Sequence, residues 1–291
     1  MKKNSGTLLS SLVLAALLAL PLGVSAQKAK KLTHTNKTTL KTKEADGNMA
    51  SQTNKKMKVE IWSDVMCPFC YIGKRKFEAA LGTFENRDNI EIVWKSFQLQ
   101  PGLKTDPSKS TVQHLAESKG WSMDQTRETI KYVTDMAEIV GLHYNFDKAV
   151  VANSFDAHRF IQFAKTKGKG DAAEEGLFKA YFTEGKNTAD HAVLIQLGNE
   201  IGLDVDAVKQ VLQGSDFTAE VNRDISESQQ LGVSGVPFFV FDRKYAVSGA
   251  QDSKVFLENL NKAWKEHAAA NPGALDKTNT GAVCTPDGEC K

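Results

Sequence analysis

Residues 57–73 read MKVEIWSDVMCPFCYIG and decide the fold, because a strand ends there and a helix begins at a cysteine pair. Alternation over residues 57–65 predicts a β-strand, and residues 72–84 place apolar side chains at helical spacing. Two cysteines separated by two residues can close a small disulfide at a helix start. Cys67 would then lie near the helix N-terminus, where unpaired backbone N–H groups favour negative charge. This pattern is typical of a reactive thiolate.

Residues 1–26 have the pattern of a secretion signal. Lys2 and Lys3 precede an apolar run over residues 8–22, and the small residues Val24-Ser25-Ala26 form a cleavage site. The sequence therefore predicts an exported protein, periplasmic or otherwise extracytoplasmic, whose mature chain begins at Gln27. A retained membrane anchor is the alternative, but the apolar run is short for a span, so we expect no stable membrane insertion after cleavage.

Residues 27–56 are predicted to be a disordered linker, because they are polar and nearly free of large apolar side chains. Their eight lysines and two acidic residues give a charge of +6. Subtracting this and the +2 of the signal from the +2 of the whole chain leaves −6 for residues 57–291. The folded part is therefore mildly acidic, which argues against nucleic acid as a partner.

The remaining elements follow the order strand–helix–strand, a helical block, then strand–strand–helix. A second strand is predicted at 90–99, with a short link that favours parallel pairing. From about residue 110 to 231 the apolar spacing is helical, with signals such as the capping box at Ser122 and Gln125. A strand at 238–241 and its hairpin partner then precede a last helix.

This order predicts an α/β protein with the thioredoxin fold (βαβ…ββα) and an inserted all-helical domain. The expected segments are a thioredoxin-like domain at 57–103 and 232–268, a helical insertion at 104–231 and a flexible tail at 269–291. The tail carries Cys284 and Cys290, which are separated by five residues.

The motifs also carry a family resemblance over about residues 57–267. The chain resembles the DsbA-like thioredoxin superfamily, and within it the FrnE-like group. The resemblance rests on Ser63 to Gly73, Asn153, Ala157-His158-Arg159, Phe178 to Phe182, and Gly235-Val236-Pro237. It implies a thiol–disulfide oxidoreductase that needs no organic cofactor or metal. Its partners would be cysteine-containing protein substrates and a redox partner that recycles the cysteine pair.

The resemblance also implies roles for single residues. Cys67 would be the exposed attacking thiol, and Cys70 would resolve the mixed disulfide from one helical turn inside. Pro237 would follow a cis peptide bond that places the Val236 backbone beside Cys67, ready to pair with an extended substrate. Phe69 should be partly exposed beside the thiol, where it could contact apolar substrate surface.

Two positions depart from the superfamily pattern. Phe69 stands where a Trp or a His is usual, so we expect a less extreme oxidant than DsbA. Ile61 stands where a buried acid is usual, and Asp64 is the acid available nearby. Asp64 would either assist proton transfer or serve as a strand-end turn residue.

His158 is expected to be a hydrogen-bonded histidine that faces the domain contact rather than a catalytic one.

The cysteines outside the motif leave alternatives open. Exported proteins usually hold their cysteines oxidised, so Cys284 and Cys290 are a candidate disulfide. It would either exchange with the Cys67–Cys70 pair or form a small clip. Three other functions remain: a glutathione-dependent isomerase or transferase of the kappa-like branch, a zinc module built from all four cysteines, and a chaperone role.

Overall fold

The computed structural model describes residues 55–272. Along this part of the chain the elements are β1 (Met57–Ser63), α1 (Pro68–Thr83), η1 (Arg87–Asn89), β2 (Ile90–Ser96), β3 (Asp106–Ser110), α2 (Thr111–Lys119), α3 (Met123–Ile139), β4 (Val150–Val151), α4 (Phe155–Thr166), α5 (Gly170–Phe178), η2 (Lys179–Glu184), α6 (His191–Glu200), α7 (Val205–Gln213), α8 (Thr218–Gln230), β5 (Phe238–Phe241), β6 (Tyr245–Ser248) and α9 (Ser253–Ala270).

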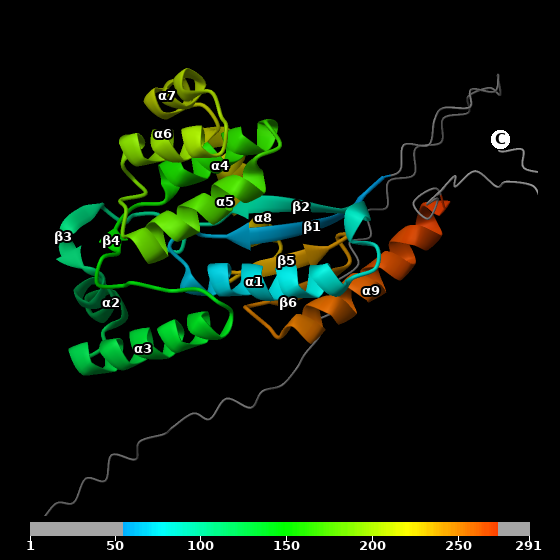
Figure 1. Cartoon of the computed structure of the whole chain (residues 1–291), viewed down its shortest axis with the longest axis horizontal. Helices are drawn as coiled ribbons and strands as arrows, with labels where there is room; N and C mark the ends of the chain where they lie inside the picture. The colour runs from blue at the N-terminus through cyan, green and yellow to red at the C-terminus, as the bar shows by residue number, and fades with distance from the viewer. Residues whose placement is uncertain (1–54, 273–291) are drawn as a thin grey trace, which may run out of the picture.

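A four-stranded sheet in the order β2-β1-β5-β6 forms the centre of the fold (Figure 1). β1 pairs parallel with β2 and antiparallel with β5, and β5 forms an antiparallel hairpin with β6. The hairpin turn places Asp242 and Arg243 at positive φ. The predicted parallel pair, the hairpin and the βαβ…ββα order are confirmed.

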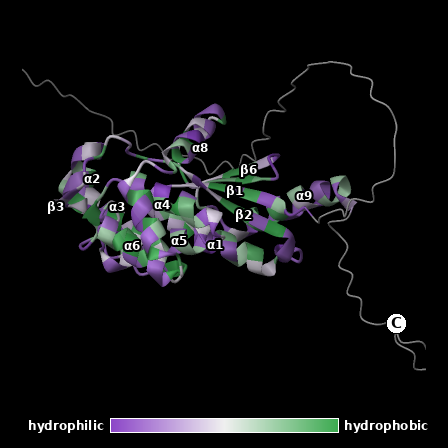
Figure 2. Cartoon of the chain, turned by 90° about the horizontal axis from the view of Figure 1, so that it is seen from above, coloured by the Kyte–Doolittle hydropathy of each residue, from purple (hydrophilic) through white to green (hydrophobic). Residues whose placement is uncertain are grey.

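Helices cover both faces of this hydrophobic sheet (Figure 2). α1 and α9 pack together on one face, and α8 packs against β2 on the other. The core between α1, α9 and the sheet is aromatic: the ring of Phe256 lies 4.5 Å from that of Phe239 and 5.9 Å from that of Phe77. All three are at most 1 % exposed. Complete burial of each contributes about 1.5–3 kcal/mol to stability.

The chain between β2 and β5 forms the insertion, and the C-terminal ends of β1 and β2 point toward it (Figure 1). The prediction that the insertion is all-helical is wrong in one detail, because β3 and β4 pair as a two-stranded antiparallel ribbon. β4 is only two residues long, so it cannot show the alternation that identifies a strand in a sequence. A second difference is that α5 continues directly into a π-helical turn, η2.

Stacked aromatic rings join the insertion to the cysteine helix. Tyr71 of α1 stacks on Phe178 of α5 at 4.9 Å, and Tyr144 stacks on Phe182 at 4.6 Å. The Tyr144 hydroxyl donates a 2.7 Å hydrogen bond to the carbonyl oxygen of Pro68, in the first turn of α1. The start of α1 is therefore held by the insertion as well as by the sheet.

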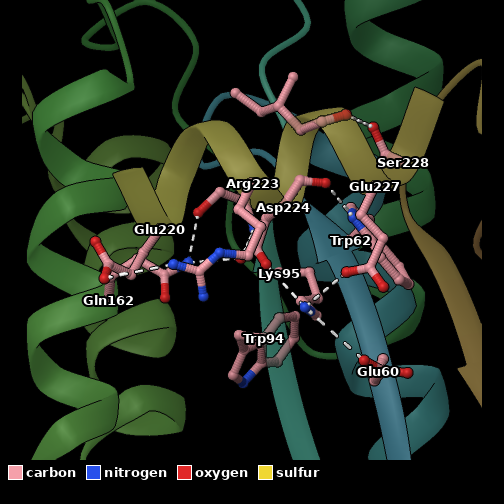
Figure 3. Close-up of polar contacts among 12 residues, drawn as sticks. Glu60, Trp62, Trp94, Lys95, Gln162, Glu220, Arg223, Asp224, Glu227 and Ser228 are labelled. Atoms are coloured by element: carbon pink, nitrogen blue, oxygen red, sulfur yellow. Dashed lines mark hydrogen bonds and ion pairs between the residues drawn. The ribbon is translucent and has the colours of Figure 1, made fainter. Parts of the chain in front are cut away.

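A buried charge network centred on Asp224 fixes α8 to the sheet (Figure 3). The Asp224 carboxylate accepts hydrogen bonds from Lys95 Nζ at 2.8 Å, from the Ser96 backbone N–H at 3.1 Å and from Gln162 Nε2 at 2.6 Å. Its backbone carbonyl accepts another from Trp62 Nε1 at 2.9 Å. These partners lie on β1, β2 and α4, so one residue of α8 ties together the sheet and two inserted helices.

Among residues 55–272, no helix combines the length and the apolar content needed to cross a bilayer. The predicted signal peptide, most of the linker and the tail lie outside the described residues.

Replacing Asp224 by alanine should lower the free energy of unfolding by about 2–5 kcal/mol, because the buried Ser96 N–H and the buried Gln162 amide would lose their acceptor. Urea unfolding of the two proteins measures this difference. Glu220→Ala is the matched control on the same helix, since its side chain is 41 % exposed. It should change stability by no more than about 0.5 kcal/mol. Equal effects of the two substitutions would contradict the role given to Asp224.

Candidate active site

Cys67 and Cys70 lie at the start of α1, as the sequence predicts. Cys67 is the N-cap residue with extended backbone angles (φ −90°, ψ 110°), and Pro68 occupies the first helical position, where no N–H donor is needed. The Cys70 backbone N–H donates to the Cys67 carbonyl oxygen at 3.0 Å. Both cysteines are free thiols in this structure.

The loop before β5 lies directly against Cys67. The Val236–Pro237 peptide bond is cis, which confirms that prediction. The Cys67 thiol donates to the Val236 carbonyl oxygen, with 3.4 Å between sulfur and oxygen. Close packing of α1 on this loop depends on Gly73, because a Cβ there would lie 2.9 Å from Cγ of Pro237. The absence of a side chain at Gly73 therefore leaves the space that the ring of Pro237 occupies.

An apolar cavity of about 370 Å³ opens beside Cys67, between the thioredoxin-like part and the inserted helices. Phe69 and Val236 line it from the thioredoxin-like side, and Phe69 is partly exposed as expected. The insertion contributes apolar and aromatic side chains: Leu115, Trp121, Ile130, Val133, Phe146 and Tyr181. His114 and Lys119 are its basic lining residues, and no carboxylate lines it within the described part of the chain.

The expectation that Cys67 is exposed is wrong, since the residue is only 4 % exposed. The cavity lining covers it, so the thiol forms part of a recessed wall rather than of the outer surface. The sequence could not indicate this because the covering residues come from distant segments.

A profile of the DSBA-like thioredoxin domain matches residues 58–261, which include the sheet, the cysteine helix and the insertion. The chain belongs to the DsbA-like thioredoxin family. Membership of this family supports a redox or isomerase enzyme.

Individual relatives agree with this membership. A structure from Streptomyces coelicolor described as a probable DsbA oxidoreductase is 36 % identical, with a TM-score of 0.68, and the match covers 81 % of this chain and 98 % of that one. The uncharacterized protein YwbO of Bacillus subtilis (strain 168) is 26 % identical over 72 % of this chain and 98 % of its own. The cytosolic disulfide reductase DsbM of Pseudomonas aeruginosa, 16 % identical with a TM-score of 0.51, shares the fold over 73 % of this chain and 98 % of its own.

The second cysteine of this DsbA-like site is enclosed. Cys70 is 1 % exposed, and burial is the main reason why the pKa of its thiol is raised well above the usual value. The neighbouring Cys67 raises that pKa further, whereas hydrogen bonds from the Asp64 backbone and the Ser63 side chain lower it. The two thiols therefore differ in their surroundings, one beside a cavity and the other sealed in protein.

Asp64 is fully buried at the end of β1. Its carboxylate accepts hydrogen bonds from the backbone N–H groups of Leu99 at 2.7 Å and Met66 at 3.4 Å, as a strand-end turn residue would. His158 Nε2 lies 3.5 Å from the same carboxylate, which is too far for a good hydrogen bond but within ion-pair distance. A role for Asp64 in proton transfer stays a prediction.

His158 faces the domain contact, as expected, and lies beside Asp64 at the end of β1. Burial tends to lower the pKa of this histidine, yet the neighbouring Asp64 and Glu174 carboxylates outweigh that effect and the pKa is raised overall. Its Nε2 atom has no hydrogen-bond partner among residues 55–272.

Glu174 is the site residue that the sequence did not reveal. It comes from α5, is 1 % exposed, and accepts a 2.5 Å hydrogen bond from the Ser63 hydroxyl. Burial raises the pKa of its carboxyl group to about 7, although Ser63, His158 and Lys74 act in the opposite direction. In the sequence, Glu174 is one of two adjacent glutamates in a predicted helix, and nothing distinguishes it from the partly exposed Glu175.

Cys284 and Cys290 lie outside the described residues, so their pairing and the four-cysteine zinc site stay predictions. Within residues 55–272, no group of three or more His, Cys, Asp or Glu side chains is arranged to hold a metal ion.

Gly73→Ala should destabilise the protein by about 1–3 kcal/mol, because its Cβ would press on the rigid ring of Pro237. Gly82→Ala, in the same helix, is the control: a Cβ there meets nothing within 4 Å. It should stabilise the helix by up to about 1 kcal/mol. Thermal or urea unfolding gives both values, and a neutral Gly73→Ala would refute the packing argument.

Glu174 should make stability depend on pH. Its folded-state pKa of about 7 lies above the usual value of 4.5, so the folded protein binds the proton more tightly. The free energy of unfolding should then fall by about 3 kcal/mol as pH rises from 4.5 to 7 and beyond. Glu174→Gln removes this slope, so the variant should gain stability over the natural protein between pH 5 and pH 8.

Glu175→Gln provides the control for this measurement. The Glu175 carboxyl has a pKa below its usual value despite partial burial, because Arg75, Tyr71 and Lys74 stabilise the charged form. It is therefore ionised at both pH 5 and pH 8, and the variant should show no pH-dependent gain. Parallel stability–pH curves for Glu174→Gln and the natural protein would exclude a raised pKa.

Proposed function

We propose that the chain is an exported thiol–disulfide oxidoreductase that exchanges disulfides with protein substrates through Cys67 and Cys70. The observation that carries this proposal is the unequal setting of the two thiols. Cys67 lies at a helix N-terminus beside an apolar cavity, and Cys70 is enclosed one helical turn further on. An attacking thiol needs contact with substrate, whereas a resolving thiol needs contact only with its partner cysteine.

In the proposed reaction the Cys67 thiolate attacks one sulfur of a substrate disulfide and forms a mixed disulfide, and the other substrate sulfur leaves as a thiolate. Cys70 then attacks the Cys67 sulfur, which closes the Cys67–Cys70 disulfide and releases the substrate thiol. The substrate gains two electrons and the enzyme loses them. The same steps run backwards when the oxidised pair transfers its disulfide to a reduced substrate.

The cavity supports a protein rather than a small polar thiol as substrate. Its lining is mainly apolar and aromatic, which suits a hydrophobic side chain next to the substrate cysteine. The Val236 backbone, 3.4 Å from Cys67 at its carbonyl oxygen, lies where an extended peptide could pair with it. Phe69 would add apolar contact on the other side of the thiol.

A glutathione-dependent reaction is the second candidate. His114 and Lys119 line the cavity and could bind a carboxylate, and glutathione carries two of these groups. Catalysis of glutathione transfer that survives Cys67→Ala together with Cys70→Ala would favour this candidate over disulfide exchange.

Export is supported by the sequence of residues 1–26, with its charged start, apolar core and cleavage site. A disulfide-exchange enzyme in such a compartment requires a partner that restores the redox state of Cys67 and Cys70. The direction of net exchange then depends on that partner and on the reduction potential of the pair.

Trapping the mixed disulfide tests the proposal. In the full chain, Cys70→Ser should accumulate a covalent complex with a disulfide-containing substrate such as insulin, because the resolving thiol is missing. Cys67→Ser should form no such complex, and insulin reduction should fall to the uncatalysed rate. The complex should be visible on a non-reducing gel and disappear with reductant.

The tail cysteines need a control in the same experiment. The trapped complex should persist when Cys284 and Cys290 are both replaced by serine, since the proposal assigns the attack to Cys67. A Cys67→Ala protein that reduces insulin as fast as the natural chain would refute the proposed function.

A further inference from the structure

The cavity beside Cys67 has two polar groups that the exchange steps above do not use. Lys119 and Trp121 line it at the link between α2 and α3. Lys119 is exposed, and neither its ammonium group nor the indole N–H of Trp121 has a hydrogen-bond or ion-pair partner among residues 55–272. The wall of a mainly apolar cavity therefore carries two donors without acceptors, which we call the Lys119–Trp121 donor pair.

We propose that the Lys119–Trp121 donor pair binds a carboxylate of the protein substrate, so that the enzyme prefers cysteines that lie near an apolar and an acidic residue. The proposal rests on the proposed function, since it describes the substrate segment that enters the cavity beside Cys67. The apolar side chain would occupy the aliphatic and aromatic part of the cavity. The acidic side chain would accept a charge-assisted hydrogen bond from the ammonium group and a second hydrogen bond from the indole N–H.

The charge on the cavity wall favours an anionic group. His114 is the other basic residue of the lining, but burial, helped by the nearby charge of Lys109, lowers the pKa of its imidazole. Its Nε2 atom lies 2.8 Å from Gln100 Oε1, which can only accept, so a neutral ring with its proton on Nε2 satisfies this contact. Near neutral pH, Lys119 is then the one cation among the described residues that line the cavity.

The carboxylates nearest to the donor pair along the chain have other partners. Glu117 forms an ion pair with Lys109, and Asp124 lies 3.8 Å from Arg127. Lys119 therefore has no counter-ion within residues 55–272, although the folded part of the chain is mildly acidic. A substrate carboxylate can supply this counter-ion.

The backbone fixes the place of the donor pair. α2 ends at Gly120, whose φ of 68° lies in the left-handed region that suits glycine. The backbone N–H of Trp121 donates to the carbonyl oxygen of Ala116 at 3.0 Å, which closes the end of the helix. The two donors thus flank a hydrogen-bonded helix cap and are held at the cavity before any substrate arrives.

Glutathione also carries carboxylates, but it has no large apolar side chain. The cavity of about 370 Å³ lies within the size range of ligand sites, and most of its lining is aliphatic or aromatic. A protein segment with an apolar and an acidic side chain fits both parts of this lining, whereas glutathione fits only the donor pair. The chemistry of the cavity therefore favours the protein segment.

Peptides with a single cysteine, carried as a mixed disulfide with 2-thiopyridine, measure this preference. The Cys67 thiolate attacks the peptide sulfur, a new disulfide forms, and the thiopyridyl sulfur leaves with the electron pair of the broken bond. Cys70 then closes the enzyme disulfide and releases the peptide thiol, which gives no signal. The peptides share a phenylalanine beside the cysteine and differ at one neighbouring position, which is glutamate, glutamine or lysine.

Stopped-flow absorbance of the released thiopyridone near pH 7.5 gives the rate constant for each peptide. All proteins are full-length and carry Cys284→Ser and Cys290→Ser, so that only the motif thiols react. The leaving group is uncharged, so the differences between peptides report on the one position that varies.

The glutamate peptide should react about three- to tenfold faster than the glutamine peptide at low ionic strength, and the lysine peptide should be the slowest. Added salt should reduce this preference, because Lys119 is accessible to solvent. Lys119→Met keeps an apolar stem of similar length and should bring the ratio of the glutamate and glutamine rate constants to about one. Lys119→Glu should reverse the order, so that the lysine peptide reacts fastest.

Lys131→Met is the matched control. Lys131 is 75 % exposed on α3 and does not line the cavity, so the parent ratio should be kept. Trp121→Phe retains an aromatic ring without the N–H and should lower the ratio without abolishing it. An unchanged ratio in Trp121→Phe would remove the indole from the proposed site.

The outcomes separate this proposal from the function on which it rests. If the parent protein reacts equally with all three peptides, or if Lys119→Met keeps the parent ratio, the donor pair does not select substrates while the proposed function stands. A thiopyridyl disulfide of glutathione that reacts as fast as the glutamate peptide, and slows by the same factor in Lys119→Met, would overturn the proposal in favour of glutathione. Release no faster than in Cys67→Ser for every peptide would refute the proposed function itself.

Discussion

The insertion meets the sheet through buried charge, and the rest of the site depends on that contact. Asp224 of α8 accepts hydrogen bonds from Lys95, the Ser96 backbone and Gln162, so it ties α8 and α4 to β2. A buried carboxylate is tolerated only when its partners are in place, which restricts how the inserted helices can sit on the sheet. The same docking brings Glu174 of α5 and His158 of α4 to the C-terminal end of β1, beside the cysteine helix. The contact that fixes the inserted helices on the sheet therefore also places the polar side chains around the cysteine pair.

The two cysteines of the pair therefore have different surroundings. On one side, the cis-proline loop and the inserted helices enclose an apolar cavity that reaches Cys67. On the other, Cys70 is surrounded by β1 and by polar groups that are themselves buried, including Ser63 and the backbone of Asp64. Burial raises the pKa of the Cys70 thiol, so loss of its proton is disfavoured in the enclosed site. This asymmetry fits a division between an attacking and a resolving thiol.

Much of the fold could be predicted because its signals are local. The strand–helix switch at Cys67, the helical spacing of the insertion and the hairpin near Asp242 all lie within short windows of sequence, and the cis bond before Pro237 followed from the family resemblance. The features that were missed depend on contacts between distant segments. Ser63 and Glu174 are 111 residues apart, and the side chains that cover Cys67 come from both halves of the chain. The two-residue strand β4 was missed because two residues are too few to show the alternation of apolar and polar side chains that identifies a strand.

The asymmetry of the two thiols can be measured directly by alkylation. The reduced, folded protein is treated with iodoacetamide at pH 7, and the modified cysteine is identified by mass spectrometry of its peptides. Cys67 should be labelled, while Cys70 should stay unmodified until the protein is unfolded. Labelling of Cys70 as fast as Cys67, or no labelling of Cys67 in the folded protein, would contradict it.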